Sequence, residues 1–160
     1  AVVATSKAFN TAGLKCAQVV TADAATRDRL VGVPMARNES WASLVVVAAV
    51  AAYRDGDAWL AALVERLDHL RTLLAELLAE HLPQARMRPL EATYLAWLDL
   101  RAYGHDDPTT VCVAGGVQPS PGHLYEPGLP GHVRLNIATS PQRLTEIVRR
   151  MGAALSPSAS

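Results

Sequence analysis

The chain has 160 residues, of which 50% are hydrophobic and 19% are charged, and its 15 basic and 15 acidic residues give a formal net charge of zero. This length fits one domain, or one domain with part of another, and the composition excludes a disordered chain. The balanced charge gives no electrostatic footprint for nucleic acid or for an anionic membrane surface, so neither is predicted as a partner.

A metal site and a membrane-spanning helix are not predicted either. The two cysteines, Cys16 and Cys112, lie far apart, and with five scattered histidines they give none of the spacings of a metal site. Cysteines used in this way favour a reducing compartment, so we expect a cytoplasmic protein. The longest apolar run, residues 41–53, is shorter than the ~20 residues that a bilayer-spanning helix needs.

The first part of the chain contains two strand-like segments. Residues 1–5, "AVVAT", predict a buried strand that leads into a loop containing Lys7. Residues 14–22, "LKCAQVVTA", predict a second apolar strand, with Lys15 near its start. The chain begins inside the first strand and without a methionine, so we interpret it as part of a longer polypeptide.

Three helices are predicted next. Residues 25–30 predict a short helix, and residues 41–53 predict a helix that is apolar on every side and therefore buried on both faces. Asn38 or Ser40 is the predicted N-cap of that second helix. Residues 57–83 predict a long amphipathic helix that packs on a core. Its apolar stripe consists of leucines three or four residues apart: Leu60, Leu63, Leu67, Leu70, Leu74 and Leu77.

The character of the sequence changes after this helix. Residues 92–101, "ATYLAWLDLR", predict a strand, and we expect Tyr94 and Trp97 in the core. Residues 115–132 contain too many glycines and prolines for regular structure beyond a short strand. His132, at the end of this stretch, is predicted to be an exposed or capped loop residue.

The last segments are a strand and a helix. Residues 133–140, "VRLNIATS", alternate between apolar and polar residues as a strand does. Ser140 and Pro141 give an N-cap followed by proline at the first helical position, so a helix is predicted over residues 141–155. The element order therefore predicts an α/β fold that ends in an α+β unit.

Four motifs together resemble one family. "SKAFNTAGLK" at residues 6–15 follows the pattern S-K-x-(F/W)-x-x-x-G-(L/W)-(K/R) of the fold-type-I pyridoxal-phosphate enzymes, the class I/II aminotransferase superfamily. "TYLAWLDLR" at 93–101, "SPGHLY" at 120–125 and "HVRLNIATSPQRL" at 132–144 are similar to the cystathionine β-lyase branch, which also contains the maltose-regulon modulator. The resemblance extends over essentially the whole chain.

The resemblance implies a role for each matched position. Lys7 matches the lysine that forms the Schiff base with pyridoxal 5'-phosphate, and Ser6 precedes it as in the family. Lys15 matches the Lys or Arg that pairs with the cofactor phosphate. Arg134 matches the arginine that holds the α-carboxylate of a small amino-acid substrate. The family often has a serine near the phosphate where this chain has Ala4, which has no hydroxyl to offer the phosphate.

Elementary chemistry agrees with these roles. A Schiff-base amine must be a lysine because a guanidinium does not lose its proton, whereas a phosphate contact needs only a cation. A carboxylate is held best by a bidentate guanidinium such as Arg134. Tyr125, in the Gly/Pro-rich loop, is a further candidate for substrate binding. The alternatives are a surface role for Lys7, a solvated strand-edge charge for Lys15 and a structural ion pair for Arg134.

Three functions are considered for the parent protein. The resemblance implies a pyridoxal-phosphate-dependent carbon–sulfur β-lyase that acts on cystathionine or a cysteine conjugate. A class I/II aminotransferase is the alternative enzyme, because both reactions begin when Lys7 removes the Cα proton. The third hypothesis is a truncated or regulatory module that has no catalytic activity and works by binding a protein.

The resemblance also implies a domain organisation. Residues 1–56 would end the large cofactor-binding domain, residues 57–83 would form a connecting helix, and residues 84–160 would form the small α+β domain. The family implies a homodimer, with the loop at residues 38–40 near its interface.

We expect the 160 residues to be inactive on their own. In the family, the groups that bind the pyridine nitrogen, the ring face and most of the phosphate precede the Schiff-base lysine, whereas only six residues precede Lys7 here. The apolar segments at 1–22 and 41–53 are expected to expose apolar surface and to cause association.

Overall fold

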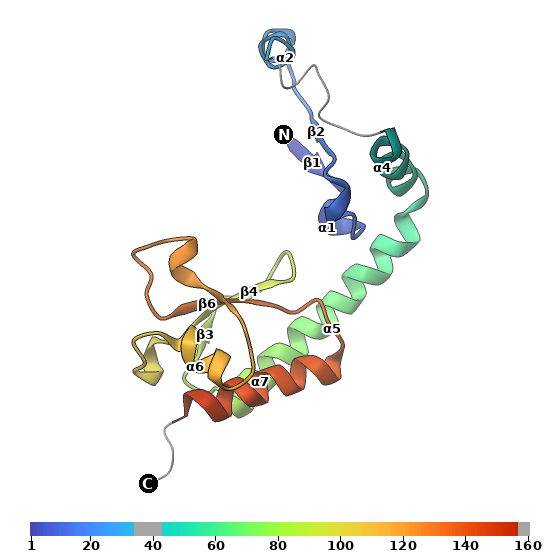
Figure 1. Ribbon diagram of the computed structural model, residues 1–160. Helices are drawn as coiled ribbons and strands as arrows, with labels where there is room; N and C mark the ends of the chain where they lie inside the picture. Colours follow the sequence, from blue (N-terminus) through green and yellow to red (C-terminus); the bar gives the residue numbers. More distant parts are fainter. Residues whose placement is uncertain (34–42, 157–160) are drawn as a thin grey trace. The chain divides into compact units, whose positions relative to one another are not determined.

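A computed structural model describes residues 1–33 and 43–156 (Figure 1). The chain divides into two compact units, Ala1–Glu65 and Arg66–Ser160. The division falls inside the long helix α5 (Asp57–His81), which begins where the leucine pattern predicts and ends two residues before the predicted position 83. The predicted cap at Asn38 or Ser40 and the predicted interface loop at 38–40 lie outside the described residues.

The first unit contains a two-stranded antiparallel sheet. Strand β1 (Val2–Ala4) pairs with β2 (Ala17–Val19), and Val3 lies opposite Gln18. Both strands are shorter than predicted, because the chain between them forms the one-turn helix α1 (Thr5–Ala8) and the 3₁₀ turn η1 (Ala12–Leu14).

Two further helices of this unit follow the sheet. Helix α2 (Ala24–Val31) begins at Asp23, whose carboxylate accepts a hydrogen bond of 2.7 Å from the backbone N–H of Thr26. Helix α4 (Ser43–Asp55) ends just before Gly56. These two helices confirm the predicted positions of helical structure within the described residues.

The apolar residues of the first unit are largely exposed. Helix α4 buries only Val45 and Ala49 among its described residues, so the prediction that both of its faces are covered is not met in this chain. Val2 on β1 is 72% exposed and Val47 on α4 is 65% exposed. This confirms the expected exposed apolar surface for the described residues, whereas the expected association stays a prediction.

The second unit is built on a four-stranded antiparallel sheet. Its strand order is β3-β4-β6-β5, so the last strand in the sequence lies between two earlier ones. The strands are β3 (Arg86–Met87), β4 (Leu95–Asp99), β5 (Ser120–Pro121) and β6 (His132–Asn136). The 3₁₀ turns are η2 (Arg101–Tyr103) and η3 (Gly122–Leu124).

Two capped helices complete this unit. Helix α6 (Pro108–Ala114) begins at Asp107, whose carboxylate accepts a hydrogen bond of 2.9 Å from the N–H of Thr109. Helix α7 (Pro141–Leu155) has the predicted bounds, and the hydroxyl of Ser140 caps it by accepting a hydrogen bond of 3.2 Å from the N–H of Arg143.

The hydrophobic core of the second unit lies on one face of the sheet. Ala96 and Leu98 of β4 and Val133 and Leu135 of β6 are buried together with the apolar stripes of α5 and α7. Helices α5 and α7 lie side by side in Figure 1, and a Cβ at Gly152 would collide with the backbone carbonyl of His81. Because strand side chains alternate, the polar and aromatic residues of β4 and β6 lie on the opposite face.

None of the helices in the described ranges is both long and apolar enough to cross a membrane. Within the same ranges, no three His, Cys, Asp or Glu side chains gather in a way that could hold a metal ion.

Candidate functional site

Lys7 lies on the short helix α1 and not in the predicted loop. The N–H of Phe9 donates to the carbonyl of Thr5 at 2.9 Å, which closes the single turn. Thr5 is buried, and its hydroxyl lies 2.7 Å from the hydroxyl of Thr11. The turn therefore has a fixed inner side, while the side chain of Lys7 is exposed.

The residues that follow Lys7 are anchored on α4 and the start of α5. The ring of Phe9 packs edge-to-face on Tyr53 with 6.0 Å between centroids. The indole N–H of Trp59 donates to the carbonyl of Ala8 at 3.1 Å. A Cβ at Gly56 would collide with the Phe9 ring, so this position requires glycine. Side chains from distant parts of the first unit thus hold the backbone next to Lys7.

Lys15 was predicted to lie near the start of the second strand. In the structure it instead caps the end of the 3₁₀ turn η1. Its backbone lies in the left-handed region, with φ 49° and ψ 52°, which few residues other than glycine adopt. Strand β2 begins two residues later at Ala17. Lys15 is exposed, Ser6 on α1 is half-buried, and neither lysine forms an ion pair within the part of the chain that the structure describes.

Arg134 lies in the centre of the second unit's sheet. It is paired with Trp97 on β4 and with Ser120 on β5, so these three residues lie side by side across the strands. Its Nη2 donates to the hydroxyl of Ser120 at 3.3 Å, and its guanidinium lies 4.6 Å from the centroid of the Tyr125 ring. No carboxylate pairs with Arg134 among the described residues, so the predicted alternative of a structural ion pair has no partner there.

An aromatic row extends from Arg134 along the same face of the sheet. The ring of Tyr125 packs edge-to-face on Trp97 with 5.8 Å between centroids. Trp97 stacks on His132, with centroids 5.9 Å apart and ring planes at 24°. The prediction that Trp97 belongs to the core is therefore wrong, because the core residues Ala96 and Leu98 point to the other face. His132 is also not an exposed loop residue but a buried residue that begins β6.

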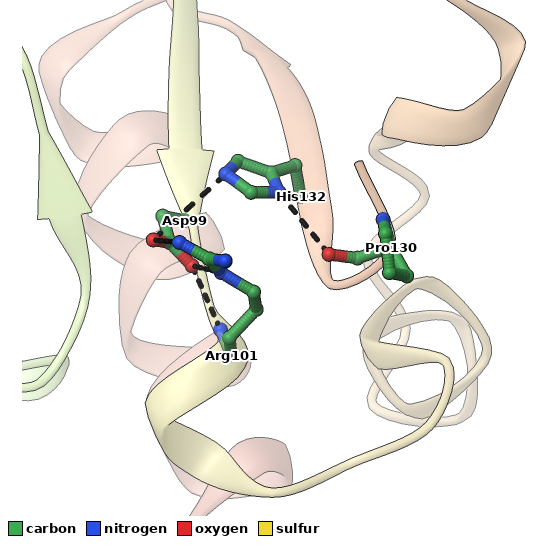
Figure 2. Close-up of polar contacts among 4 residues, drawn as sticks. All are labelled: Asp99, Arg101, Pro130 and His132. Atoms are coloured by element: carbon green, nitrogen blue, oxygen red, sulfur yellow. Dashed lines mark hydrogen bonds and ion pairs between the residues drawn. The ribbon is translucent and has the colours of Figure 1, made fainter. Parts of the chain in front are cut away.

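Polar contacts fix His132, the last ring of this row (Figure 2). Its Nδ1 lies 3.1 Å from the carbonyl oxygen of Pro130, and its Nε2 lies 3.8 Å from Oδ2 of Asp99. Arg101 donates to both carboxylate oxygens of Asp99, at 2.9 and 2.7 Å, and its backbone N–H adds a third bond of 3.0 Å. Hydrogen bonding from Arg101 holds the pKa of Asp99 well below its ordinary value.

Sequence reasoning found Arg134 and Tyr125 but missed Trp97, His132 and Asp99. The sequence gives little signal for the face on which Trp97 lies, because positions 95–98 are all apolar and only Asp99 is polar. Lys7, Lys15 and Ser6 belong to the first unit, whereas Arg134 and Tyr125 belong to the second. Within the second unit, the structure brings Arg134 and Tyr125 into direct contact.

Comparison with known proteins confirms the predicted resemblance. Residues 1–151 match the family described as aminotransferase class I and II. A Mycobacterium tuberculosis protein provisionally named cystathionine beta-lyase is 39% identical over 97% of this chain and 42% of its own length. Cystathionine beta-lyase PatB of Bacillus subtilis is 34% identical over 96% of this chain and 41% of its own length. The chain thus spans about two fifths of the length of these relatives.

A solved structure agrees with this fold assignment. The PLP-bound C-S lyase of Staphylococcus hominis, crystallised with L-cycloserine, matches 96% of this chain and 38% of its own chain with a TM-score of 0.86 and 31% identity. The predicted fold class, part of a fold-type-I pyridoxal-phosphate enzyme, is confirmed by this match. The chain belongs to the aminotransferase class I and II family.

Proposed function

We propose that this chain is the C-terminal portion of a pyridoxal 5'-phosphate-dependent carbon–sulfur β-lyase that acts on small amino acids. The observation that carries the proposal is the environment of the Arg134 guanidinium. Its guanidinium is oriented by Ser120 and Tyr125 and has no carboxylate partner among the described residues, so it is available to bind one. The names of the M. tuberculosis and B. subtilis relatives support the lyase over other reactions.

The two lysines fit a phosphorylated aldehyde as cofactor. Both are exposed, and α1 and η1 hold them at fixed points of the first unit. Lys7 would supply the amine that joins the aldehyde, and Lys15 would place a positive charge beside the phosphate, with Ser6 next to Lys7. When bound, pyridoxal 5'-phosphate supplies the electron sink for charge that develops at the substrate Cα.

In the reaction, Lys7 would remove the proton from the substrate Cα as a general base. Later in the reaction it would return that proton as a general acid. Arg134 would bind the α-carboxylate through two parallel N–H donors, which fixes the direction of the Cα–H bond. Loss of a thiolate from the β-carbon then distinguishes the lyase from a transaminase. The family name supports an aminotransferase as the second candidate, because transamination uses the same proton removal.

We further propose that residues 1–56 belong to the large cofactor-binding domain, that 57–83 connect the domains, and that 84–160 form the small domain. The exposed apolar face of the first unit supports this assignment, because strands buried on both faces are typical of a larger sheet. We place the complete protein in the cytoplasm as a homodimer, and we expect the 160 residues alone to be inactive.

Assay of the complete protein with L-cystathionine tests the reaction. Pyruvate and a free thiol are expected for the lyase, whereas formation of a keto acid that keeps its sulfur would favour the aminotransferase. In the same protein, reduction with borohydride followed by peptide mapping should locate the cofactor on Lys7.

Lys7→Arg should abolish the visible absorption of the bound cofactor, because a guanidinium does not form the Schiff base. Lys15→Arg is the matched control, since it keeps the charge at the phosphate and should weaken cofactor retention only modestly. A reduced adduct on Lys15 would contradict the assignment.

A further inference from the structure

An arginine that recognises a carboxylate works best when its guanidinium is held in place before the ligand arrives. A free arginine side chain loses rotamer freedom on binding, at a cost that lowers affinity. Arg134 has only one hydrogen bond to another side chain in the described chain, the 3.3 Å contact with Ser120. Its orientation therefore depends on the Tyr125 ring, which covers one face of the guanidinium.

The Tyr125 ring is itself held from behind. Tyr125 follows the 3₁₀ turn η3 and is 48% exposed, so its own loop does not bury it. The edge-to-face contact with Trp97 gives the ring a defined orientation, and Trp97 is in turn stacked on His132. Each ring in this row thus limits the positions that its neighbour can take.

The far end of the row is fixed by hydrogen bonds. The carbonyl of Pro130 can only accept, so Nδ1 of His132 carries a hydrogen and the ring plane is set. Asp99, 3.8 Å from Nε2, is itself held by the side chain and the backbone N–H of Arg101 (Figure 2). His132 is 9% exposed and cannot reorient without disturbing β6.

We propose that Trp97 and His132, anchored by Asp99, are positioning residues that act through Tyr125 to hold the guanidinium of Arg134 ready for a substrate carboxylate. The row gives the site its preference for ligands that carry an α-carboxylate. This inference rests on the proposed function, because it assumes that Arg134 binds that group. Trp97, Tyr125 and Arg134 lie on the face of the sheet opposite the core, so their contacts do not serve to close the core.

The test compares two ligands on the complete, cofactor-loaded protein. One is 2-aminoisobutyrate, which has an α-carboxylate but no Cα hydrogen for Lys7 to remove. The other is tert-butylamine, in which a methyl group replaces the carboxylate and which also has no hydrogen on that carbon. The ratio of their dissociation constants, measured by titration calorimetry, is the carboxylate preference. This equilibrium quantity is independent of turnover.

Tyr125→Leu should lower the carboxylate preference by about threefold to tenfold, because the cation–π contact with Arg134 is lost. Tyr125→Phe should keep it, since the ring remains. Trp97→Leu should lower the preference in the same direction, and Trp97→Phe should restore part of it. Tyr125 is half exposed, so its variants are expected to fold even if a change at Trp97 destabilises the unit.

Arg134→Gln separates the two proposals. If it removes the carboxylate preference while Tyr125→Leu and Trp97→Leu leave that preference unchanged, the positioning role is wrong and the proposed function stands. If Arg134→Gln leaves the preference unchanged, both proposals are overturned. Loss of preference in all three variants, with retention in Tyr125→Phe, supports both.

Discussion

The two units of the chain use their apolar residues in different ways. In the second unit, Leu98, Val133, Leu144 and other core residues are completely buried. In the first unit, Val47 on α4 and Val2 on β1 are more than half exposed. A run of valines therefore does not by itself close a core, because it must meet a second apolar face. Among the residues that the structure describes, the second unit contains both faces and the first unit does not. The described part of the first unit has an apolar composition typical of a protein core, but many of its apolar side chains are exposed.

Truncation of a buried leucine should show the largest difference between the units. Leu98→Ala removes a fully buried side chain from β4 and should cost about 2–5 kcal/mol of the free energy of unfolding of the second unit. Val47→Ala, on the exposed side of α4, should change stability by no more than about 0.5 kcal/mol. Hydrogen exchange at the amides of β4 and β6 measures the effect of Leu98→Ala, and exchange at the amides of α4 measures the effect of Val47→Ala. Equal losses of protection in the two variants would contradict the comparison.

The two cysteines offer a chemical version of the same comparison. Burial raises the pKa of the Cys112 thiol from 9.0 to about 11, whereas Cys16 in the first unit is only half-buried. Because the thiolate is the reactive form, the pKa alone should slow labelling of Cys112 at pH 8 by about a hundredfold relative to a thiol of ordinary pKa. Peptide mapping after treatment with a thiol reagent should find the label on Cys16 first, and on Cys112 only in denaturant. Early label on Cys112 would show that the second unit opens readily.

Acid should reveal a smaller effect that acts through Asp99 in the second unit. The pKa of Asp99 is held below its ordinary value of about 4, so the folded form binds a proton less readily than the unfolded form. The resulting stabilisation is present above about pH 4 and is lost as the pH falls through the lower pKa of the folded unit. Asp99→Asn should therefore make the fall in stability below pH 4 shallower.

Arg101→Gln should flatten the same part of the stability curve, because hydrogen bonding from Arg101 is the main cause of the lowered pKa. Urea unfolding between pH 2 and pH 6, followed by circular dichroism, is the measurement. An acid limb with the wild-type slope in both variants would count against this pairing.

The elements predicted well are those with local signals. Helix α7 has its predicted bounds because Ser140 and Pro141 mark its start chemically. The strand predicted at residues 92–101 begins only at Leu95, because Thr93 has a left-handed φ of 66° and its hydroxyl accepts from the N–H of Leu95 at 3.1 Å. The strand predicted at 133–140 stops at Asn136, whose side-chain oxygen accepts from the N–H of Ala138 at 2.9 Å.

The candidate site was predicted less completely than the fold. Motif resemblance identified Lys7 and Arg134 as candidate site residues, but it did not place Lys7 on a helical turn. The four residues of α1 have no side-chain cap, so the sequence gives no signal for the start of this helix. The face of the sheet on which Trp97 lies depends on which side the helices cover, and that is decided by contacts far apart in the sequence. Hydrophobicity assigned this residue to the core, although it is part of the polar face that carries Arg134.

The position of β6 between β4 and β5 has a consequence for how the protein is made. Strand β6, residues 132–136, is synthesised after both of its neighbours. Neither the β4–β6 pair nor the β5–β6 pair can therefore form while the ribosome is still adding the preceding loop. Domains generally fold as they emerge from the ribosome, and here the sheet must wait for its last strand. Nascent chains stalled before residue 132 leaves the exit tunnel should be cut by protease at β4, and longer chains should be protected. The strand that completes the sheet is also the one that carries Arg134, so this arginine reaches its position between β4 and β5 only when the sheet closes.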